Sequence, residues 1–207
     1  MIKIERVSVM NLENAIRGAR NPMNSWARMD SEYDSEGNYV LGENDLDLAK
    51  RLAHAGSDHR KFLRQIFVSV DITAPLYWWK EFDTYKVGTV ANSTSTMHKV
   101  HSKPFERDDF SFDRLDEGGL RALDAIIAYL EEERIKFNEN KEERQHWHNI
   151  IQILPSSYNQ MRTVTMNYEN LINMYYARKS HKLAEWHTYC DFIKSLPYAN
   201  ELILIKD

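Results

Sequence analysis

The spacing of apolar and polar positions predicts both strands and helices in this chain. Residues 2–9, IKIERVSV, alternate imperfectly and indicate a first strand, and residues 66–75, IFVSVDITAP, indicate a second. Apolar residues recur with helical spacing in LDLAKRLAHAG, a segment that stops at Gly56. The clearest amphipathic helix is predicted over residues 118–137.

The C-terminal third is predicted to be mostly helical. Residues 141–153 have a helical pattern that Pro155 ends, and residues 157–178 are interpreted as one long helix rich in Met, Tyr and Asn. A last helix is expected over 181–195, and the closing ELILIK is interpreted as a strand. A few strands among four or five helices, in no strict alternation, predict the α+β class.

Residues 20–44 form a polar excursion or lid, punctuated by Asp, Ser, Gly and Asn. The chain has 207 residues, a length that suits one domain with a substantial core. We therefore expect residues 1–207 to be a single domain.

Charge and cysteine content exclude several classes of protein. The net charge is −4, from 27 basic and 31 acidic residues, so no basic field is present to attract nucleic acid. The single cysteine, Cys190, excludes an internal disulfide framework and suits a reducing compartment. No apolar run approaches the about 18 residues that a membrane span needs. We expect a cytoplasmic protein without a membrane partner.

The histidines and the cysteine do not predict a metal site or a nucleophile. His98 and His101 lie three residues apart, and His146 and His148 flank a Trp, but neither pair has a Cys or carboxylate placed to complete four ligands. Cys190 has only a histidine nearby on its probable helix, so we expect a buried structural thiol.

A hydroxyl-rich segment, TVANSTST, carries the strongest chemical pattern. Lys86 precedes it and His98 follows it, and its polar side chains are Thr89, Asn92, Ser93, Thr94, Ser95 and Thr96. Hydroxyls and a cation at one place are typical of a phosphate or nucleotide pocket, and the alternative is an ordinary polar turn. The nearby Trp78-Trp79 pair is expected in the core, although it could stack on a planar ligand; burial of the two rings distinguishes these interpretations.

Several further residues occur in an order and spacing that resemble a known family. They are the His54 and Gly56 turn, Phe62, the IFVSVDITAP strand, Leu154-Pro155, Asn167-Tyr168-Glu169-Asn170-Leu171 and Arg178. Over residues 46–195 this series resembles the flavin-dependent thymidylate synthases, the ThyX family. The resemblance implies a small, mostly antiparallel sheet packed with several long helices, in an oligomer.

The basic residues of the family's motifs are largely replaced. Its Arg-His-Arg triplet aligns with Thr84-Tyr85-Lys86, and other polar motif positions are occupied by Ser57, Glu81, Ile151 and Glu169. A nucleotide monophosphate carries close to two negative charges, and each lost charge-assisted hydrogen bond costs roughly 1.5 to 3 kcal/mol. A retained activity therefore requires substitute cations, for which the candidates are Lys86, Arg162, Arg178 and Lys182.

The resemblance also implies roles for individual residues. Lys86 and Thr89 would be catalytic. The nucleotide, dUMP, would contact Arg178, Thr89, Asn92, Ser93 and Ser95. FAD would contact Ser57, Tyr85, Lys86, Asn167 and Asn173, within a homotetramer that uses methylene-tetrahydrofolate as carbon donor and NADPH as reductant.

Three functional hypotheses follow. The first is a family-type enzyme that transfers a methyl group to a pyrimidine nucleotide by a flavin-dependent reductive route. The second is a remodelled pocket that binds or modifies a different nucleotide without flavin, with Trp78 and Trp79 lining it. The third is a non-catalytic oligomeric binding protein whose 20–44 excursion contacts a partner. Because a fold does not determine a function, ranking the first hypothesis highest rests on analogy.

Overall fold

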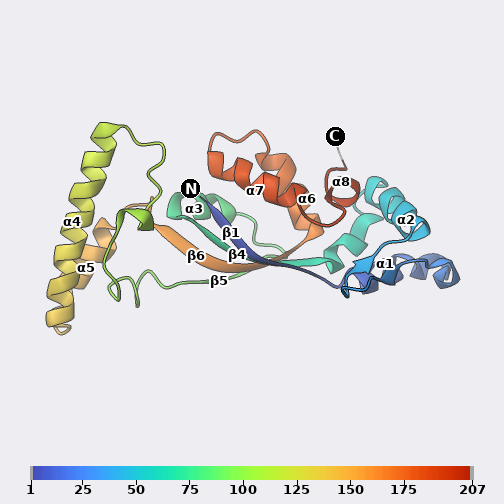
Figure 1. The fold of residues 1–207 in the computed structure, drawn as a ribbon, viewed down its shortest axis with the longest axis horizontal. Coiled ribbons are helices and arrows are strands. Elements are labelled where there is room, and N and C mark those ends of the chain that lie inside the picture. The colour runs from blue at the N-terminus through green and yellow to red at the C-terminus, as the bar shows by residue number, and fades with distance from the viewer. Residues whose placement is uncertain (1, 206–207) are drawn as a thin grey trace. The chain divides into compact units, whose positions relative to one another are not determined.

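A computed structural model gives the structure of residues 2–205 and confirms the α+β class. Its main sheet is small and antiparallel, with four strands in the order β1-β4-β6-β5, and β2 and β3 form a separate antiparallel pair (Figure 1). The strands are β1 Lys3–Met10, β2 Glu32–Tyr33, β3 Tyr39–Val40, β4 Phe67–Pro75, β5 Val90–Ser93 and β6 Asn159–Asn167.

Helices make up much of the remaining chain. The α-helices are α1 Leu12–Ala19, α2 Glu43–His54, α3 Leu76–Phe82, α4 Glu117–Glu139, α5 Arg144–Ile153, α6 Tyr168–Arg178, α7 Ala184–Lys194 and α8 Ala199–Leu202. Short 3-10 helices are η1 Asn21–Met23, η2 Trp26–Arg28, η3 Arg60–Gln65 and η4 Arg107–Asp109. Among the described residues, no helix is both long enough and apolar enough to span a bilayer.

Two local predictions are wrong. The long helix expected over 157–178 is a strand, β6, followed directly by α6, because Gln160, Val164 and Met166 point into the interior at even spacing. The C-terminal segment expected as a strand contains the short helix α8, which buries Leu202. The last residue of that segment, at position 206, lies outside the described residues.

The chain forms two compact units. Four of the five boundaries between them fall inside β1, β4, β5 and β6, and the fifth lies between residues 84 and 85. The first unit contains the residues up to 3, 72–84 and 92–163, and the second contains 4–71, 85–91 and 164 onward.

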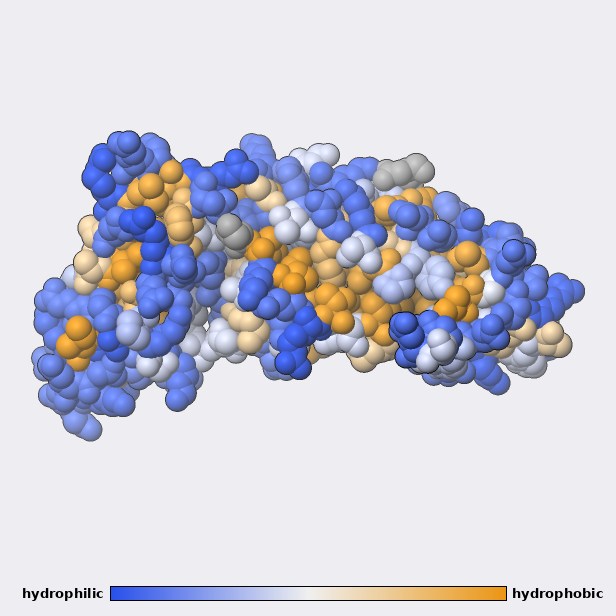
Figure 2. Space-filling model, viewed as in Figure 1, coloured by the Kyte–Doolittle hydropathy of each residue, from blue (hydrophilic) through white to orange (hydrophobic). Residues whose placement is uncertain are grey.

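The first unit is organised around the α4–α5 hairpin. Helices α4 and α5 pack side by side (Figure 1) and enclose a cluster with the preceding loop, made of Val100, Phe105, Phe110, Leu123, Leu130 and Ile150. Figure 2 shows apolar residues among hydrophilic ones on the visible face of this hairpin. Glu133 of α4 is buried within the hairpin, where it accepts hydrogen bonds from His146 Nδ1 at 2.9 Å and Asn149 Nδ2 at 2.5 Å.

The Trp78-Trp79 pair lies in the core of the first unit, with 0% and 1% of the two side chains exposed. Trp79 Nε1 donates to the Gln160 carbonyl at 2.9 Å, and the guanidinium of Arg162 lies 4.3 Å from the centre of the Trp79 ring. Rings buried to this extent do not line a ligand site, which removes the main support for the flavin-free remodelled pocket.

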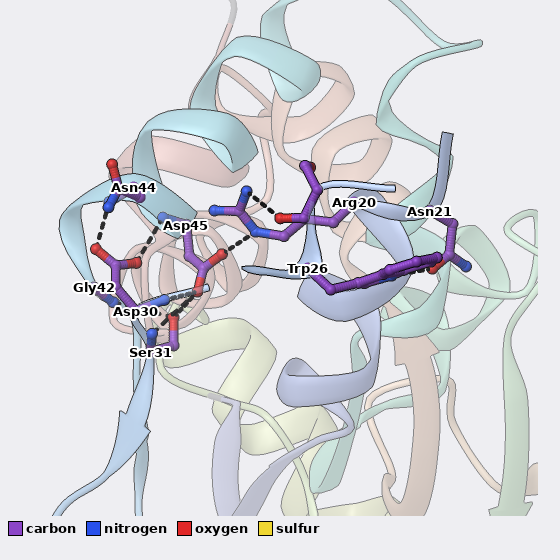
Figure 3. Close-up of polar contacts among 9 residues, drawn as sticks. Arg20, Asn21, Trp26, Asp30, Ser31, Gly42, Asn44 and Asp45 are labelled. Carbon is purple, nitrogen blue, oxygen red and sulfur yellow. Dashed lines mark hydrogen bonds and ion pairs between the residues drawn. The ribbon is translucent and has the colours of Figure 1, made fainter. Parts of the chain in front are cut away.

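The 20–44 excursion of the second unit is fixed by a buried ion pair (Figure 3). Asp45, at the start of α2, is fully buried, and its Oδ1 accepts from Arg20 Nε at 2.6 Å. Its Oδ2 accepts from the Ser31 hydroxyl at 2.6 Å. Burial raises the pKa of Asp45, but the hydrogen bonds from Ser31 and Arg20 outweigh it, so the net pKa is lowered. The carboxylate is therefore charged and holds the excursion against α2.

A second carboxylate from the excursion caps α2. Asp30 accepts from the backbone N–H of Asn44 at 2.8 Å and of Asp45 at 3.0 Å (Figure 3). A Cβ at Gly42 would lie 2.3 Å from Asp30 Cγ, so only glycine fits beside this cap. The excursion is thus an ordered part of the second unit.

Candidate functional site

Val87 and Gly88 lie against the first turn of α6 in the second unit. Asn167 and Asn170 form a capping box, in which Asn167 Oδ1 accepts from the Asn170 N–H at 3.0 Å and Asn170 Oδ1 accepts from the Asn167 N–H at 3.1 Å. Asn170 Nδ2 then donates to the Val87 carbonyl at 2.7 Å. The helix cap therefore positions the segment that carries Lys86 and Thr89.

Gly88 makes this close approach possible. Its φ is +76°, and a Cβ there would lie 2.9 Å from Asn170 Oδ1 and 3.1 Å from Asn167 Nδ2. The next residue, Thr89, has a buried hydroxyl with no hydrogen-bond partner among the described residues. A ligand hydroxyl or phosphate oxygen could satisfy that group.

The guanidinium of Arg178 is held between aromatic rings at the end of α6. Its Nε donates to the Tyr85 hydroxyl at 2.9 Å, and its centre lies 4.7 Å from the Trp186 ring and 5.5 Å from the Tyr85 ring. Stacking and a hydrogen bond fix the plane of the guanidinium, which is the arrangement that suits recognition of a phosphate or carboxylate.

Glu169, which occupies a polar position of the family's motif, is neutralised by Arg60, a residue not predicted from the sequence to belong to the site. Arg60 of η3 forms a two-pronged contact with Glu169, with Nε and Nη2 at 3.0–3.1 Å from the carboxylate oxygens. Each side chain is 13% exposed. The repulsion that Glu169 would exert on a phosphate is therefore largely cancelled, and Arg60 is not free to replace a lost arginine.

A pocket of about 590 Å³ opens beside η3 in the same unit. Its apolar walls include Pro22, Met23, Leu48, Leu52 and Phe62, and its polar lining includes Asn21, Ser25, His59, Lys61 and Gln65. The 20–44 excursion supplies one wall of the pocket. Within it, Trp26 Nε1 donates to Asn21 Oδ1 at 2.9 Å, which orients the Asn21 side chain (Figure 3). Apolar walls with a few polar groups suit a flat, partly polar ligand.

His59 and Lys61 are not among the residues predicted from the sequence, because the family resemblance in this region rests on His54, Gly56 and Phe62. Their signal is the basic run His59-Arg60-Lys61 directly before Phe62. Ser57 lies in the turn just before this run and is exposed, and Asn173 is exposed on α6.

The hydroxyl-rich segment is not wholly a loop. Residues 90–93 form β5, with Asn92 and Ser93 exposed on it. The Ser95 hydroxyl accepts from the backbone N–H groups of Met97 and His98, at 3.2 and 2.9 Å. Ser95 therefore stabilises the turn that follows β5, which is the alternative interpretation given for this segment.

The substitute cations differ in availability. Arg162 is used within the first unit, where it forms an ion pair with Asp83 at 2.7 Å and covers Trp79. Lys86 and Lys182 are exposed, and neither has an ion pair among residues 2–205. Arg178, held by Tyr85 and Trp186, and the exposed Lys86 are the two candidate cations considered further for a phosphate.

The thiol of Cys190 and the possible metal ligands show no sign of a further reactive site among the described residues. Cys190 is buried on α7, as expected, and burial raises the pKa of its thiol to about 11, which disfavours the thiolate. Within the described part of the chain, no three His, Cys, Asp or Glu residues are grouped to hold a metal ion.

Solved structures establish the fold class as that of the flavin-dependent thymidylate synthases. The chain superposes on ThyX from Helicobacter pylori with FAD and dUMP with a TM-score of 0.72 and 18% identity, covering 100% of both chains. A second Helicobacter pylori ThyX, complexed with FAD and dUMP, matches with a TM-score of 0.67 and 19% identity over 96% of this chain and 98% of that one.

A UMP/dUMP methylase, PolB from Streptomyces cacaoi bound with 5-Br dUMP, has the same fold. Its TM-score is 0.67 with 13% identity, over 99% of this chain and 95% of that one. No protein-family model matches the sequence, and no curated protein matches it. The chain is thus ThyX-like in fold, with a sequence far from these proteins.

Proposed function

We propose that this protein binds a pyrimidine nucleotide of the dUMP type through the second unit. The observation that carries the proposal is the stacked guanidinium of Arg178, fixed by Tyr85 and Trp186 on a ThyX-like fold. A phosphate is best recognised by a planar donor whose orientation is set before the ligand arrives.

The charges of the site suit a phosphate of moderate affinity. Arg178 contacts the phosphate, and Lys86 supplies a second positive charge. Arg60 neutralises Glu169, so that carboxylate does not oppose the two cations. Each missing arginine contact costs roughly 1.5 to 3 kcal/mol, so we expect weaker binding than a site with three arginines would give.

The polar groups around the phosphate complete the proposed nucleotide site. Thr89 offers its buried hydroxyl to the nucleotide. Asn92, Ser93 and Ser95 belong to the first unit, and their proposal as nucleotide contacts rests on the family resemblance alone. Lys86 and Thr89 are proposed as the residues nearest the reacting base. Their support is the family resemblance together with the position of the 85–89 segment against α6.

A flavin-dependent methyl transfer to the pyrimidine is the finer form of the proposal. The pocket beside η3 is the proposed place for the flat ring of FAD. The residues that the family resemblance implies for FAD do not line this pocket; they are Ser57, Tyr85, Lys86, Asn167 and Asn173. When bound, the flavin would supply hydride transfer, with methylene-tetrahydrofolate as carbon donor and NADPH as reductant. The assembly proposed for this activity is a homotetramer.

Calorimetric titration with dUMP tests the nucleotide proposal. Arg178→Gln should weaken binding at least about tenfold, and Arg178→Lys should also weaken it, because lysine keeps the charge but loses the planar fork. The matched control is Arg51→Gln, which removes an exposed arginine of α2 that pairs with Asp47. Equal affinity of the Arg178 variants and the control for dUMP would contradict the proposal.

The visible absorbance spectrum tests the flavin. The protein is incubated with excess FAD and desalted, and we expect a retained flavin band that weakens in Lys61→Gln and persists in the control Lys50→Gln, an exposed lysine of α2. If the unmodified protein keeps no flavin band, the flavin-dependent route is excluded while nucleotide binding is still measured by calorimetry.

A further inference from the structure

A second pocket, of about 430 Å³, lies at the turn between α4 and α5 in the first unit. Two cations, two histidines and two aromatic rings face it: Lys141, Arg144, His98, His101, Phe137 and Trp147. All of these residues belong to the first unit, so the pocket is described without reference to the Arg178 site.

Specific contacts hold the walls of this pocket in place. Trp147 Nε1 donates to the Met97 carbonyl at 2.9 Å, which ties α5 to the turn after β5. Asn138 Nδ2 donates to the His101 carbonyl at 3.0 Å. The His101 ring meets the Phe137 ring edge-on, with centroids 4.8 Å apart. The pocket is therefore formed before any ligand binds.

The cations of the pocket lack carboxylate partners. Lys141 and Arg144 are exposed, and neither forms an ion pair within residues 2–205. One acidic residue, Glu142, also lines the pocket and offsets one of the two charges. The lining thus keeps a net positive charge in a chain whose overall charge is −4.

His101 lies among the cations of this pocket. Burial lowers the pKa of His101, and Lys141, Lys99 and Arg134 lower it further. Arg134 is itself paired with Glu131. His101 Nδ1 is buried and has no hydrogen-bond partner in the described chain. The ring is therefore a neutral imidazole surrounded by cations, and a bound anion would relieve that imbalance.

We propose that this pocket binds a phosphate monoester, with the phosphate group between Lys141 and Arg144 and the organic group against Trp147 and Phe137. Two cations on one rim can each form charge-assisted hydrogen bonds to a phosphate dianion. The aromatic walls and the volume offer room for a flat organic group beyond the phosphate. The proposal rests on the first unit alone and does not depend on nucleotide binding at Arg178.

Proton NMR of the histidine rings tests this proposal directly. The His101 resonance is assigned by its loss in His101→Gln, and the protein is titrated with phenyl phosphate, with inorganic phosphate, and with chloride at equal ionic strength. We expect saturable shifts and a raised titration midpoint of His101, because an adjacent anion favours the charged imidazole. Phenyl phosphate should bind more tightly than inorganic phosphate.

Variants that remove a charge from the pocket rim distinguish a specific phosphate site from non-specific electrostatic attraction of the anion. Arg144→Gln and Lys141→Gln should each weaken phenyl phosphate binding about tenfold or more. The control is Arg121→Gln, an exposed arginine of α4 outside the pocket lining, which should bind like the unmodified protein.

Three outcomes would overturn the proposal. They are a His101 resonance that responds no more to phenyl phosphate than to chloride, an equal loss of binding in Arg121→Gln and Arg144→Gln, and equal affinity for inorganic phosphate and phenyl phosphate. Equal affinity for the two ligands would mean that the pocket recognises the phosphate group alone and that the organic group adds nothing to binding.

Discussion

Glu169 illustrates how one substitution can be tolerated when a distant residue compensates for it. The dipole of α6 stabilises a carboxylate in the first turn of the helix. Arg60, 109 residues away in sequence, supplies the opposite charge. The residues adjacent to Arg60 and Glu169 in the sequence do not account for the presence of either charge. The pair has to be judged as a unit.

Removing one member of this pair should therefore cost more than removing both. Arg60→Gln leaves the Glu169 charge 13% exposed and unpaired, and we expect a loss of about 3 kcal/mol in the free energy of unfolding. Urea unfolding measures it. The double variant Arg60→Gln with Glu169→Gln should recover most of the loss; a double variant as unstable as the single one would contradict this account.

At the scale of elements, the 85–89 segment and α6 depend on one glycine. Gly88→Ala would place a Cβ against the Asn167–Asn170 capping box in a left-handed backbone conformation. We expect a loss of about 2 to 3 kcal/mol, from backbone strain and crowding together. It should also weaken dUMP binding, because the segment carries Lys86.

Gly37→Ala is a matched control for that substitution. Gly37 has a similar φ of +83°, but a Cβ there would meet nothing within 4 Å. Only backbone strain of about 1 to 2 kcal/mol is expected. Urea unfolding compares the two variants, and equal losses would show that the cap does not constrain Gly88.

The α4–α5 hairpin contains a pH-dependent contact. The hydrogen bond from His146, with further bonds from Asn149 and Lys136, lowers the pKa of Glu133 despite burial. A lowered folded-state pKa stabilises the protein above the ordinary glutamate pKa near 4.5, and this contribution is lost as the pH falls through the lower folded value.

Glu133→Gln should therefore be destabilising by about 1 to 3 kcal/mol at pH 7. The difference from the unmodified protein should shrink as the pH is lowered below 4.5. The neighbouring Glu132→Gln, which removes an exposed carboxylate paired with Lys136, should show little change at either pH. Urea unfolding at several pH values checks this, and a pH-independent difference would contradict it.

At the scale of the whole molecule, the two compact units are connected through their strands. Four of their five boundaries fall inside β1, β4, β5 and β6, so neither unit contains a complete strand of the main sheet. We propose that residues 1–207 unfold as one domain. Calorimetry should show one transition whose calorimetric and van't Hoff enthalpies agree; two resolved transitions would show that the units unfold separately.

Much of the fold could be predicted from the sequence, because helices such as 118–137 have a clear apolar period. β6 was missed, since its inward positions include the polar Gln160 and the strand runs into α6 without a break. The Asn167–Asn170 cap is local and lay within the recognised motif. Contacts such as Arg60–Glu169 and Tyr85–Arg178 join distant segments, and no local pattern reports them.

The most direct test of the central claim is a calorimetric titration of the unmodified protein with dUMP and with AMP under the same conditions. The account predicts saturable dUMP binding, with AMP at least about tenfold weaker, a difference of about 1.4 kcal/mol. Absence of dUMP binding, or equal affinity for AMP, would contradict the assignment of a pyrimidine nucleotide site to this ThyX-like fold.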